Sequence, residues 1–167
     1  MGDYKNLVMY KIKLVIVGKL KEQFHIAEQE EYLKRLSKYV QINLIEIKDK
    51  KIPENASEKE EQNVKYAETA EIFKHINKDD YVILLDLYGK EYDSIEFSSW
   101  LKNNLDAKQN LTFVIAGSLG YDELAYKMAK EKVKLSRLTF THQMTRIILL
   151  EQIYRSFKII NNETYHK

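Results

Sequence analysis

The chain has 167 residues, of which 44% are hydrophobic, so it is long enough to fold as one domain around its own core. It contains no cysteine, which excludes disulfide bonds and thiolate-bound metals, and no apolar run approaches the roughly 18 residues of a membrane span. The net charge of only +2 does not mark the whole protein as a nucleic-acid binder.

Five short apolar runs predict strands, and helical patterns lie between them. The predicted strands are 11–18, 42–48, 81–87, 111–117 and 132–139. The first, third and fourth runs are nearly continuously apolar, which is typical of strands buried on both faces of a parallel sheet. The predicted helices run from Phe24 to Tyr39, from the capping box of Ser57 and Glu60 to about Ile76, from Asp93 or Ser94 to Leu105, from Asp122 to Lys130, and from His142 to Ile160. This alternation predicts an α/β fold with a mostly parallel sheet.

The glycines are not placed as in a common nucleotide-binding sheet. The first strand ends in VGKLKEQF, with a single glycine, and the chain has neither a G-x-G-x-x-G fingerprint nor a Walker A sequence. Glycines instead follow the fourth strand, in AGSLG (116–120). A strand, a glycine turn and a helix let a ligand approach backbone amides, but most such turns are only turns, so both interpretations stay open.

The last predicted helix, HQMTRIILLEQIYRSFKII, is apolar almost all round, so we expect it to be buried on more than one side, partly in a dimer interface. Glu151, Arg155 and Lys158 share one narrow stripe, and Arg146 lies on the opposite side. From the residues alone we favour a structural Glu151–Arg155 ion pair and an Arg146 that extends its head to water.

Charge and chain ends add two expectations. From Tyr126 to Lys167 there are nine Lys and Arg residues against three Asp and Glu, whereas the rest of the chain has 18 against 22. This imbalance indicates either a local anionic partner or chance. The opening MGDYKNLVMYKIK lacks the apolar stretch of a signal peptide, so we expect a soluble cytoplasmic protein.

The segment LSRLTFTHQMTRIILLEQIYRSFKIINNETYHK (135–167) resembles the C-terminal signature of the RlmH group of SPOUT-class methyltransferases. The segments KIKLVIVGKLKEQF, ILLDLYGK (83–90) and AGSLG resemble its other landmarks, so the resemblance covers a single domain, 11–167. It implies an α/β fold with helices on both faces, a C-terminal trefoil knot, and a homodimer formed through the knot and the last helix. It also implies methyl transfer from S-adenosylmethionine to N3 of a pseudouridine in a large-subunit (23S) rRNA stem-loop on the assembled ribosome. Residues 1–10 precede the usual start of the family, and we assign them no function.

The resemblance also implies the site residues. Cofactor contacts carry over to Leu85, Gly117 and the knot loop, which consists of Leu135, Ser136, Arg137, Leu138, Thr139 and Phe140. The tail of one subunit would complete the partner's site, with His166 as base or as orienter of the target base. Tyr165 would stack on or bond that base, and Glu151 would orient Arg155 or the target. Phosphate contacts would come from Arg146, Arg155 and Lys167, and His142 would be structural or contact RNA.

Two residues depart from the family pattern, and other functions remain to be weighed. Ala116 and Thr141 stand where the family usually has glycine and proline; alanine is a mild change if φ is negative. No cluster has metal-ligand spacing, so we expect no metal. The alternatives are a SPOUT enzyme acting on tRNA and a non-enzymatic ribosome-binding factor. The basic C-terminal quarter and the lack of a nucleophile–base motif disfavour a small-molecule enzyme.

Overall fold

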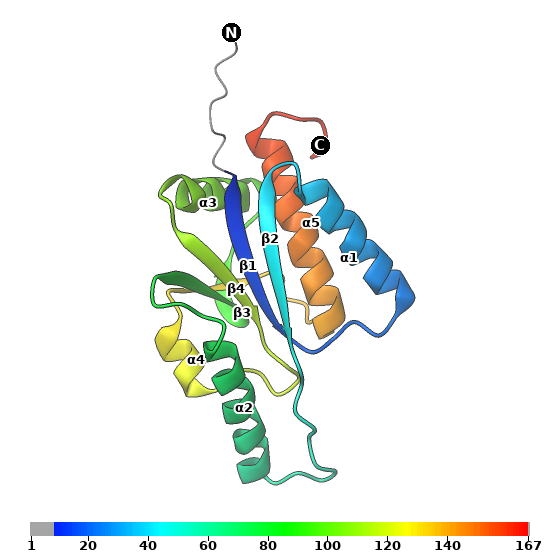
Figure 1. Cartoon of the computed structure of the whole chain (residues 1–167), viewed down its shortest axis with the longest axis vertical. Helices are drawn as coiled ribbons and strands as arrows, with labels where there is room; N and C mark the ends of the chain where they lie inside the picture. Colours follow the sequence, from blue (N-terminus) through cyan, green and yellow to red (C-terminus); the bar gives the residue numbers. More distant parts are fainter. Residues whose placement is uncertain (1–8, 167) are drawn as a thin grey trace.

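The computed structural model describes residues 9–166, in which five strands and five helices alternate (Figure 1). The strands are β1 (Tyr10–Val17), β2 (Val40–Ile47), β3 (Asp80–Glu91), β4 (Asn110–Ile115) and β5 (Glu131–Lys134). The helices are α1 (Gln23–Leu36), α2 (Glu58–Phe73), α3 (Ser94–Asp106), α4 (Glu123–Met128) and α5 (His142–Ile160). All strand pairs are parallel, in the order β2-β1-β4-β3-β5, which confirms the predicted α/β fold.

Helices cover both faces of the sheet. Alternate side chains of β1 enter two separate cores, with Leu14 and Ile16 on one face and Val15 and Val17 on the other. The first core packs against α1, α3 and α5, and the second against α2 and α4 (Figure 1). Strands that carry apolar residues on both faces explain the nearly continuous apolar runs of the sequence.

Helix starts follow the predicted capping residues. Ser57 and Glu60 form the expected capping box at the start of α2. Asp93 caps α3 through a second box with Glu96, which decides between the two predicted cap positions. Asp122 accepts a hydrogen bond from the Leu124 amide at the start of α4. Local side-chain chemistry therefore sets these three boundaries.

The fifth strand is shorter than predicted. It ends at Lys134 rather than at 139, and the following residues form a loop that leads to α5. Strand β5 pairs only with β3, at the edge of the sheet. The apolar residues of this loop line a cavity, described below, and this explains why their pattern resembles a strand.

Helix α5 has the predicted bounds, but most of its cover comes from its own protomer. Its residues Leu149, Leu150, Ile153 and Phe157 are buried in the core that α1 and α3 share with the sheet. The apolar pattern of α5 therefore does not by itself require a second subunit, and the dimer stays a prediction. No helix in the described part of the chain combines the length and apolarity needed to cross a membrane.

Candidate cofactor cavity and C-terminal cluster

A cavity of about 490 Å³ opens at the carboxyl ends of β3, β4 and β5. Its wall consists of segments 85–88, 115–121, 133–136 and 138–140, together with Lys65, Tyr126 and the first turn of α5. Ligands of parallel α/β sheets bind at this end of the strands, and small-molecule sites have volumes of roughly 300–1,000 Å³. The cavity therefore has the position and the size of a cofactor site.

One wall exists because β3 bulges away from β5. Leu85 and Lys90 are both paired with Val133, so the four residues between them leave the ladder. A Cβ atom on Gly89 would lie 2.6 Å from the Val133 backbone, which only glycine avoids. This close approach returns β3 to its partner and leaves 86–88 to face the cavity.

Gly117 is enclosed on the opposite wall. A Cβ atom there would lie 2.8 Å from Oε1 of Glu68 and 3.2 Å from Cγ1 of Val17. Glu68 is only 5% exposed, its Oε2 accepts the Lys50 amide hydrogen at 3.0 Å, and burial raises its pKa. The neighbours of Gly117 are thus held in place, and the loop beside the cavity has no room for a side chain.

A buried tyrosine joins the two strand ends that flank the cavity. The hydroxyl of Tyr121 lies 2.7 Å from the carbonyl oxygens of both Leu85 and Val114, and burial raises its pKa. Because one hydroxyl hydrogen is shared between these two carbonyls, Tyr121 fixes the spacing of β3 and β4 where both enter the cavity wall.

Asp86 is a cavity residue that the sequence analysis did not single out. Its Oδ2 atom is buried and has no hydrogen-bond partner in the described part of the chain. Burial, and next the nearby Asp86 carboxylate, raise the pKa of Tyr126 to about 12. Buried polar atoms are nearly always paired, so this oxygen fits a ligand that brings hydroxyl or amino donors. S-adenosylmethionine, with its ribose and amino groups, has such donors.

Most of the predicted cofactor residues line this cavity. They are Leu85, Gly117, Leu135, Ser136, Leu138, Thr139 and Phe140. Arg137 is the exception: it is exposed and is not part of the wall. His142 also lines the cavity, and packing around its ring lowers its pKa.

The two departures from the family pattern fit the structure. Ala116 does not have the positive φ that would make alanine costly. Thr141 caps α5, because its hydroxyl accepts the Met144 amide hydrogen at 3.2 Å. Threonine thus gives the last helix an N-cap that proline cannot supply.

The C-terminal tail turns back onto α5 (Figure 1). Asn162 has a φ of 54°, the left-handed conformation that ends many helices and that asparagine tolerates. The Glu163 amide donates to the Lys158 carbonyl at 2.9 Å, and the two side chains form an ion pair at 2.8 Å. The reversal brings Tyr165 and His166 beside the middle of the helix.

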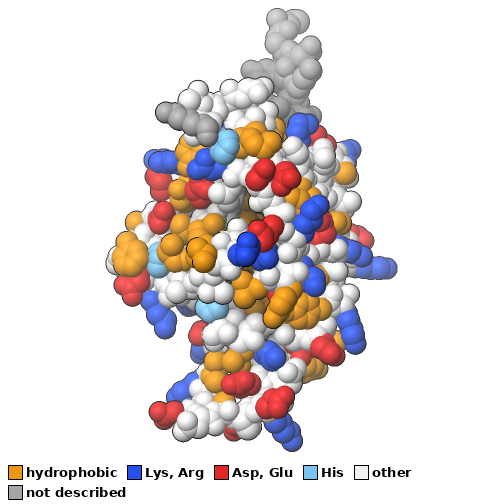
Figure 2. Space-filling model, turned by 180° about the vertical axis from the view of Figure 1, so that it is seen from behind, with side chains coloured by type: hydrophobic (Ala, Val, Ile, Leu, Met, Phe, Trp, Pro, Cys, Tyr) orange, Lys and Arg blue, Asp and Glu red, His pale blue; other side chains and the backbone are white. Residues whose placement is uncertain are grey.

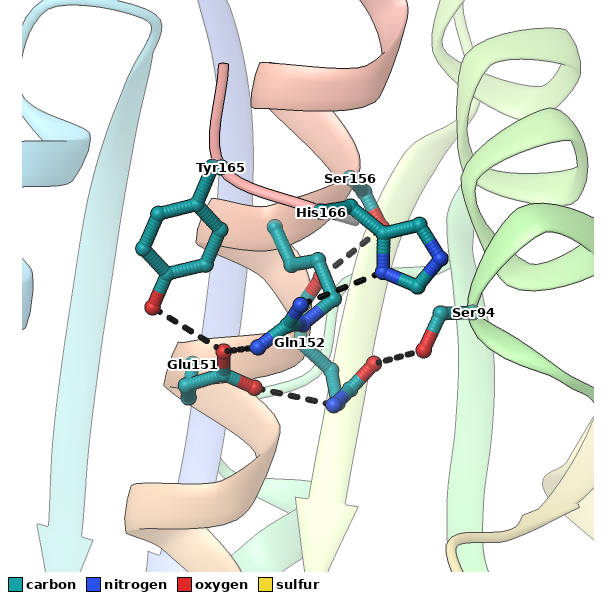
Figure 3. Close-up of polar contacts among 7 residues, drawn as sticks. Ser94, Glu151, Gln152, Ser156, Tyr165 and His166 are labelled. Atoms are coloured by element: carbon teal, nitrogen blue, oxygen red, sulfur yellow. Dashed lines mark hydrogen bonds and ion pairs between the residues drawn. The ribbon is translucent and has the colours of Figure 1, made fainter.

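Four of the predicted tail-site residues meet there (Figure 3). Oε1 of Glu151 accepts from Nη2 of Arg155 at 2.6 Å and from the Tyr165 hydroxyl at 3.1 Å. The Arg155 guanidinium lies 4.8 Å from the centre of the Tyr165 ring, and its Nη1 lies 3.1 Å from Nδ1 of His166. The Glu151–Arg155 ion pair is confirmed. Lys167 lies outside the described residues.

The structure contradicts the prediction that Arg146 contacts phosphate. Its side chain is only 1% exposed, so the alternative of a head reaching water is wrong too. It donates to Oε2 of Glu46 at 2.6 Å, to Oε1 of Gln29 at 3.2 Å and to the Gly18 carbonyl at 3.0 Å. The reason is that α1 and the ends of β1 and β2 surround this side of α5 with acceptors, which bind both terminal nitrogens of the buried guanidinium; its Nε atom has no hydrogen-bond partner in the described part of the chain.

The cavity and the tail cluster lie at different levels of α5. His142 and Thr145 line the cavity, whereas Arg155 holds the tail. At about 1.5 Å per residue, ten residues separate Thr145 from Arg155 by about 15 Å along the helix axis. The tail of a protomer therefore does not reach the cavity of that protomer in this arrangement.

Comparison with known proteins identifies the family. Residues 10–166 match the family model described as "Predicted SPOUT methyltransferase". The chain belongs to the SPOUT methyltransferase family. Proteins named "Ribosomal RNA large subunit methyltransferase H" from Clostridium kluyveri and Clostridium botulinum are 48% identical to it over 157 residues, and one from Clostridium tetani is 47% identical. Each alignment covers 93% of this chain and 99% of the relative.

SPOUT membership agrees with the parallel sheet and implies the C-terminal trefoil knot. It also gives the cavity a chemical meaning, because a methyltransferase needs a site for a methyl donor. In the described part of the chain, no group of three or more His, Asp or Glu side chains is placed to hold a metal ion.

Proposed function

We propose that this SPOUT methyltransferase methylates N3 of a pseudouridine in a stem-loop of large-subunit rRNA, with S-adenosylmethionine as donor and the assembled cytoplasmic ribosome as substrate. The observation that carries the proposal is the near-full-length similarity to large-subunit rRNA methyltransferases, at 47–48% identity. Bound S-adenosylmethionine would supply an electrophilic methyl group.

The cavity would hold the donor by shape and by backbone contacts. Gly117 contributes a part of the wall without a side chain, and the loop 135–140 contributes apolar side chains. The unpaired oxygen of Asp86 would accept a hydrogen bond from a donor group of the cofactor. Catalysis in such a site consists mainly of holding the target nitrogen in line with the methyl group.

We further propose a homodimer in which the tail of one protomer serves the cavity of its partner. Large hydrophobic side chains are exposed around the cavity and the start of α5, namely Leu87, Tyr88, Leu138, Phe140 and Met144. Figure 2 shows hydrophobic side chains exposed across the middle of one face of the molecule. Exposed apolar patches commonly mark interaction sites. The roughly 15 Å offset between cavity and tail on α5 gives a second reason for a shared site.

The basic groups near the tail would contact RNA. Arg155 is partly exposed beside His166, and the proposal extends to Lys167 as a second phosphate contact. His142, at the cavity, would be structural or contact RNA. Arg146 is excluded from this set because it is buried.

The test is a methyl-transfer assay with labelled S-adenosylmethionine. Ribosomes from cells that lack the modification would be compared with free rRNA and tRNA, and the labelled nucleoside identified by mass spectrometry. We expect N3-methylpseudouridine, formed only in ribosomes. Label in tRNA would overturn the substrate, and loss of cofactor binding together with transfer would favour a ribosome-binding factor. Light scattering of the purified protein would test the dimer.

A further inference from the structure

The contact between Arg155 and His166 fixes the tautomer of the histidine. Nη1 of Arg155 lies 3.1 Å from Nδ1 of His166. A guanidinium carries five N–H donors and no acceptor, so Nδ1 must be the accepting nitrogen. A neutral imidazole that accepts at Nδ1 carries its hydrogen on Nε2. His166 therefore presents an N–H donor, and no residue of 9–166 is bonded to that nitrogen.

The surroundings hold Arg155 in this position. Its Nη2 donates to Oε1 of Glu151 at 2.6 Å, and its plane lies over the Tyr165 ring. The other ionisable groups at the cluster come from α1, namely Tyr32 and Arg35, which neighbour Tyr165 and Tyr154. A second proton on His166 would have to replace the Arg155 N–H at Nδ1, which would break the contact.

The carboxylate of the cluster is also occupied. Oε1 of Glu151 accepts two hydrogen bonds, and its Oε2 accepts one from Nε2 of Gln152 at 2.8 Å. Ser94 lies 3.1 Å from Oε1 of Gln152, which directs the amide nitrogen of Gln152 toward Glu151 (Figure 3). Burial, followed by the nearby Glu151 carboxylate, raises the pKa of Tyr165 to about 12, so its hydroxyl keeps its hydrogen near neutral pH.

We propose that His166 acts in methyl transfer as a hydrogen-bond donor to the target base and not as the base that removes its proton. This inference rests on the function proposed above. N3 of a pyrimidine imide lies between two carbonyl groups, and loss of its hydrogen spreads negative charge onto their oxygens. The Nε2–H of His166 would donate to one of these oxygens and stabilise the anion.

Methyl transfer to N3 can be written in full without a protein group that takes the N3 proton. The N3 hydrogen goes to a water molecule or hydroxide ion of the solvent. The N3 lone pair forms the new bond to the methyl carbon, and the electron pair of the carbon–sulfur bond stays on sulfur as a neutral thioether. The cluster contributes a fixed donor, and Arg155 contributes the orientation of that donor.

The tautomer can be measured directly. Nitrogen-15 NMR of the intact protein, labelled at its four histidines, distinguishes a protonated Nε2 from a protonated Nδ1. The His166 signals would be assigned as those missing from the His166→Gln variant. We expect an unprotonated Nδ1 and a protonated Nε2 at pH 8, whereas a protonated Nδ1 would overturn the proposal.

The catalytic role is tested by single-turnover transfer on ribosomes between pH 6 and pH 9.5. Glutamine retains an N–H donor, so His166→Gln should stay within about tenfold of the wild-type rate, whereas His166→Ala should lose about 100-fold, the effect of removing one anion-stabilising donor. His75→Gln, an exposed histidine distant in sequence, is the matched control. The wild-type rate should rise with hydroxide concentration from pH 8 to pH 9.5, because hydroxide takes the N3 proton.

A histidine base would give the opposite pattern. The wild-type rate would then stay level from pH 8 to pH 9.5, and His166→Gln would be as inactive as His166→Ala. Wild-type protein that binds S-adenosylmethionine but methylates no ribosome would instead refute the proposed function. The two failures are therefore distinguishable.

Discussion

Substitution of Gly117 by alanine tests whether the cavity depends on the close packing beneath it. The added Cβ atom would lie 2.8 Å from Oε1 of Glu68, about 0.6 Å inside an ordinary contact, and 3.2 Å from Cγ1 of Val17. Glu68 cannot swing into water, because it is buried and its other oxygen holds the Lys50 amide. The strain should therefore move the loop 116–120.

The size of the effect follows from overpacking. Extra methyl groups in a packed site cost about 1–3 kcal/mol. If this cost falls on the bound state, the Kd for S-adenosylmethionine should rise by roughly 5- to 150-fold. Isothermal titration calorimetry would measure the Kd, and thermal unfolding would show how much of the cost falls on stability instead.

A double-mutant cycle identifies the source of the strain. Glu68→Ala removes the nearest clashing atom, so Gly117→Ala should cost less in the Glu68→Ala background than in the wild type, by at least 1 kcal/mol. Ser99→Ala, at an exposed position of α3 outside the cavity wall, is the control and should leave the Kd within about twofold. Unchanged affinity in Gly117→Ala, or equal costs in both backgrounds, would refute the packing argument.

Three further predictions concern other parts of the molecule. Arg146→Met should lower the free energy of unfolding in urea by about 3 kcal/mol, because it leaves Glu46 without its cation; a change below 1 kcal/mol would contradict this. Burial raises the pKa of Glu68, so its contribution to stability is present below the ordinary carboxyl pKa and is lost as pH rises through the folded-state value. Glu68→Gln should therefore raise Tm more at pH 7 than at pH 4, and an equal shift would exclude the linkage. Deletion of 165–167 should abolish transfer without changing the Kd for S-adenosylmethionine. An equal mixture of the deletion with Gly117→Val should regain about one quarter of wild-type activity, since half the dimers are mixed and each has one complete site; no recovery would contradict a shared site.

The order of strands and helices was predicted well, because apolar periodicity and capping residues determine where these elements form. Apolar runs located all five strands, and the capping chemistry of Ser57 and Asp93 located two helix starts. The end of β5 was predicted wrongly because apolar residues of the loop after Lys134 line the cavity. In a sequence, an apolar loop that lines a cavity cannot be distinguished from a buried strand. The family resemblance located the cavity loops, but not the excursion of β3 that makes their partner wall.

The remaining site features depend on contacts between distant segments. Arg146 was assigned to phosphate because a helical wheel shows its neighbours on α5 but not its acceptors at Glu46 and Gly18. The unpaired oxygen of Asp86 is likewise visible only once its surroundings are known. A carboxylate inside an otherwise apolar predicted strand, 81–87, was the one available signal for it. The tautomer of His166 depends on Arg155, 11 residues away across a chain reversal.

Helix α5 relates the two halves of the proposed site. Its first turn lines the cavity and is anchored to the ends of β1 and β2 by Arg146, and its middle holds the tail. A rigid helix with one anchored end keeps the distance between the halves constant, so a protomer cannot close the gap by bending. In a two-fold symmetric dimer whose α5 helices lie side by side and antiparallel, the tail of each protomer would lie at the cavity of the other. Such a dimer has two equal sites, whereas an interface elsewhere on the surface would leave both cavities without a tail.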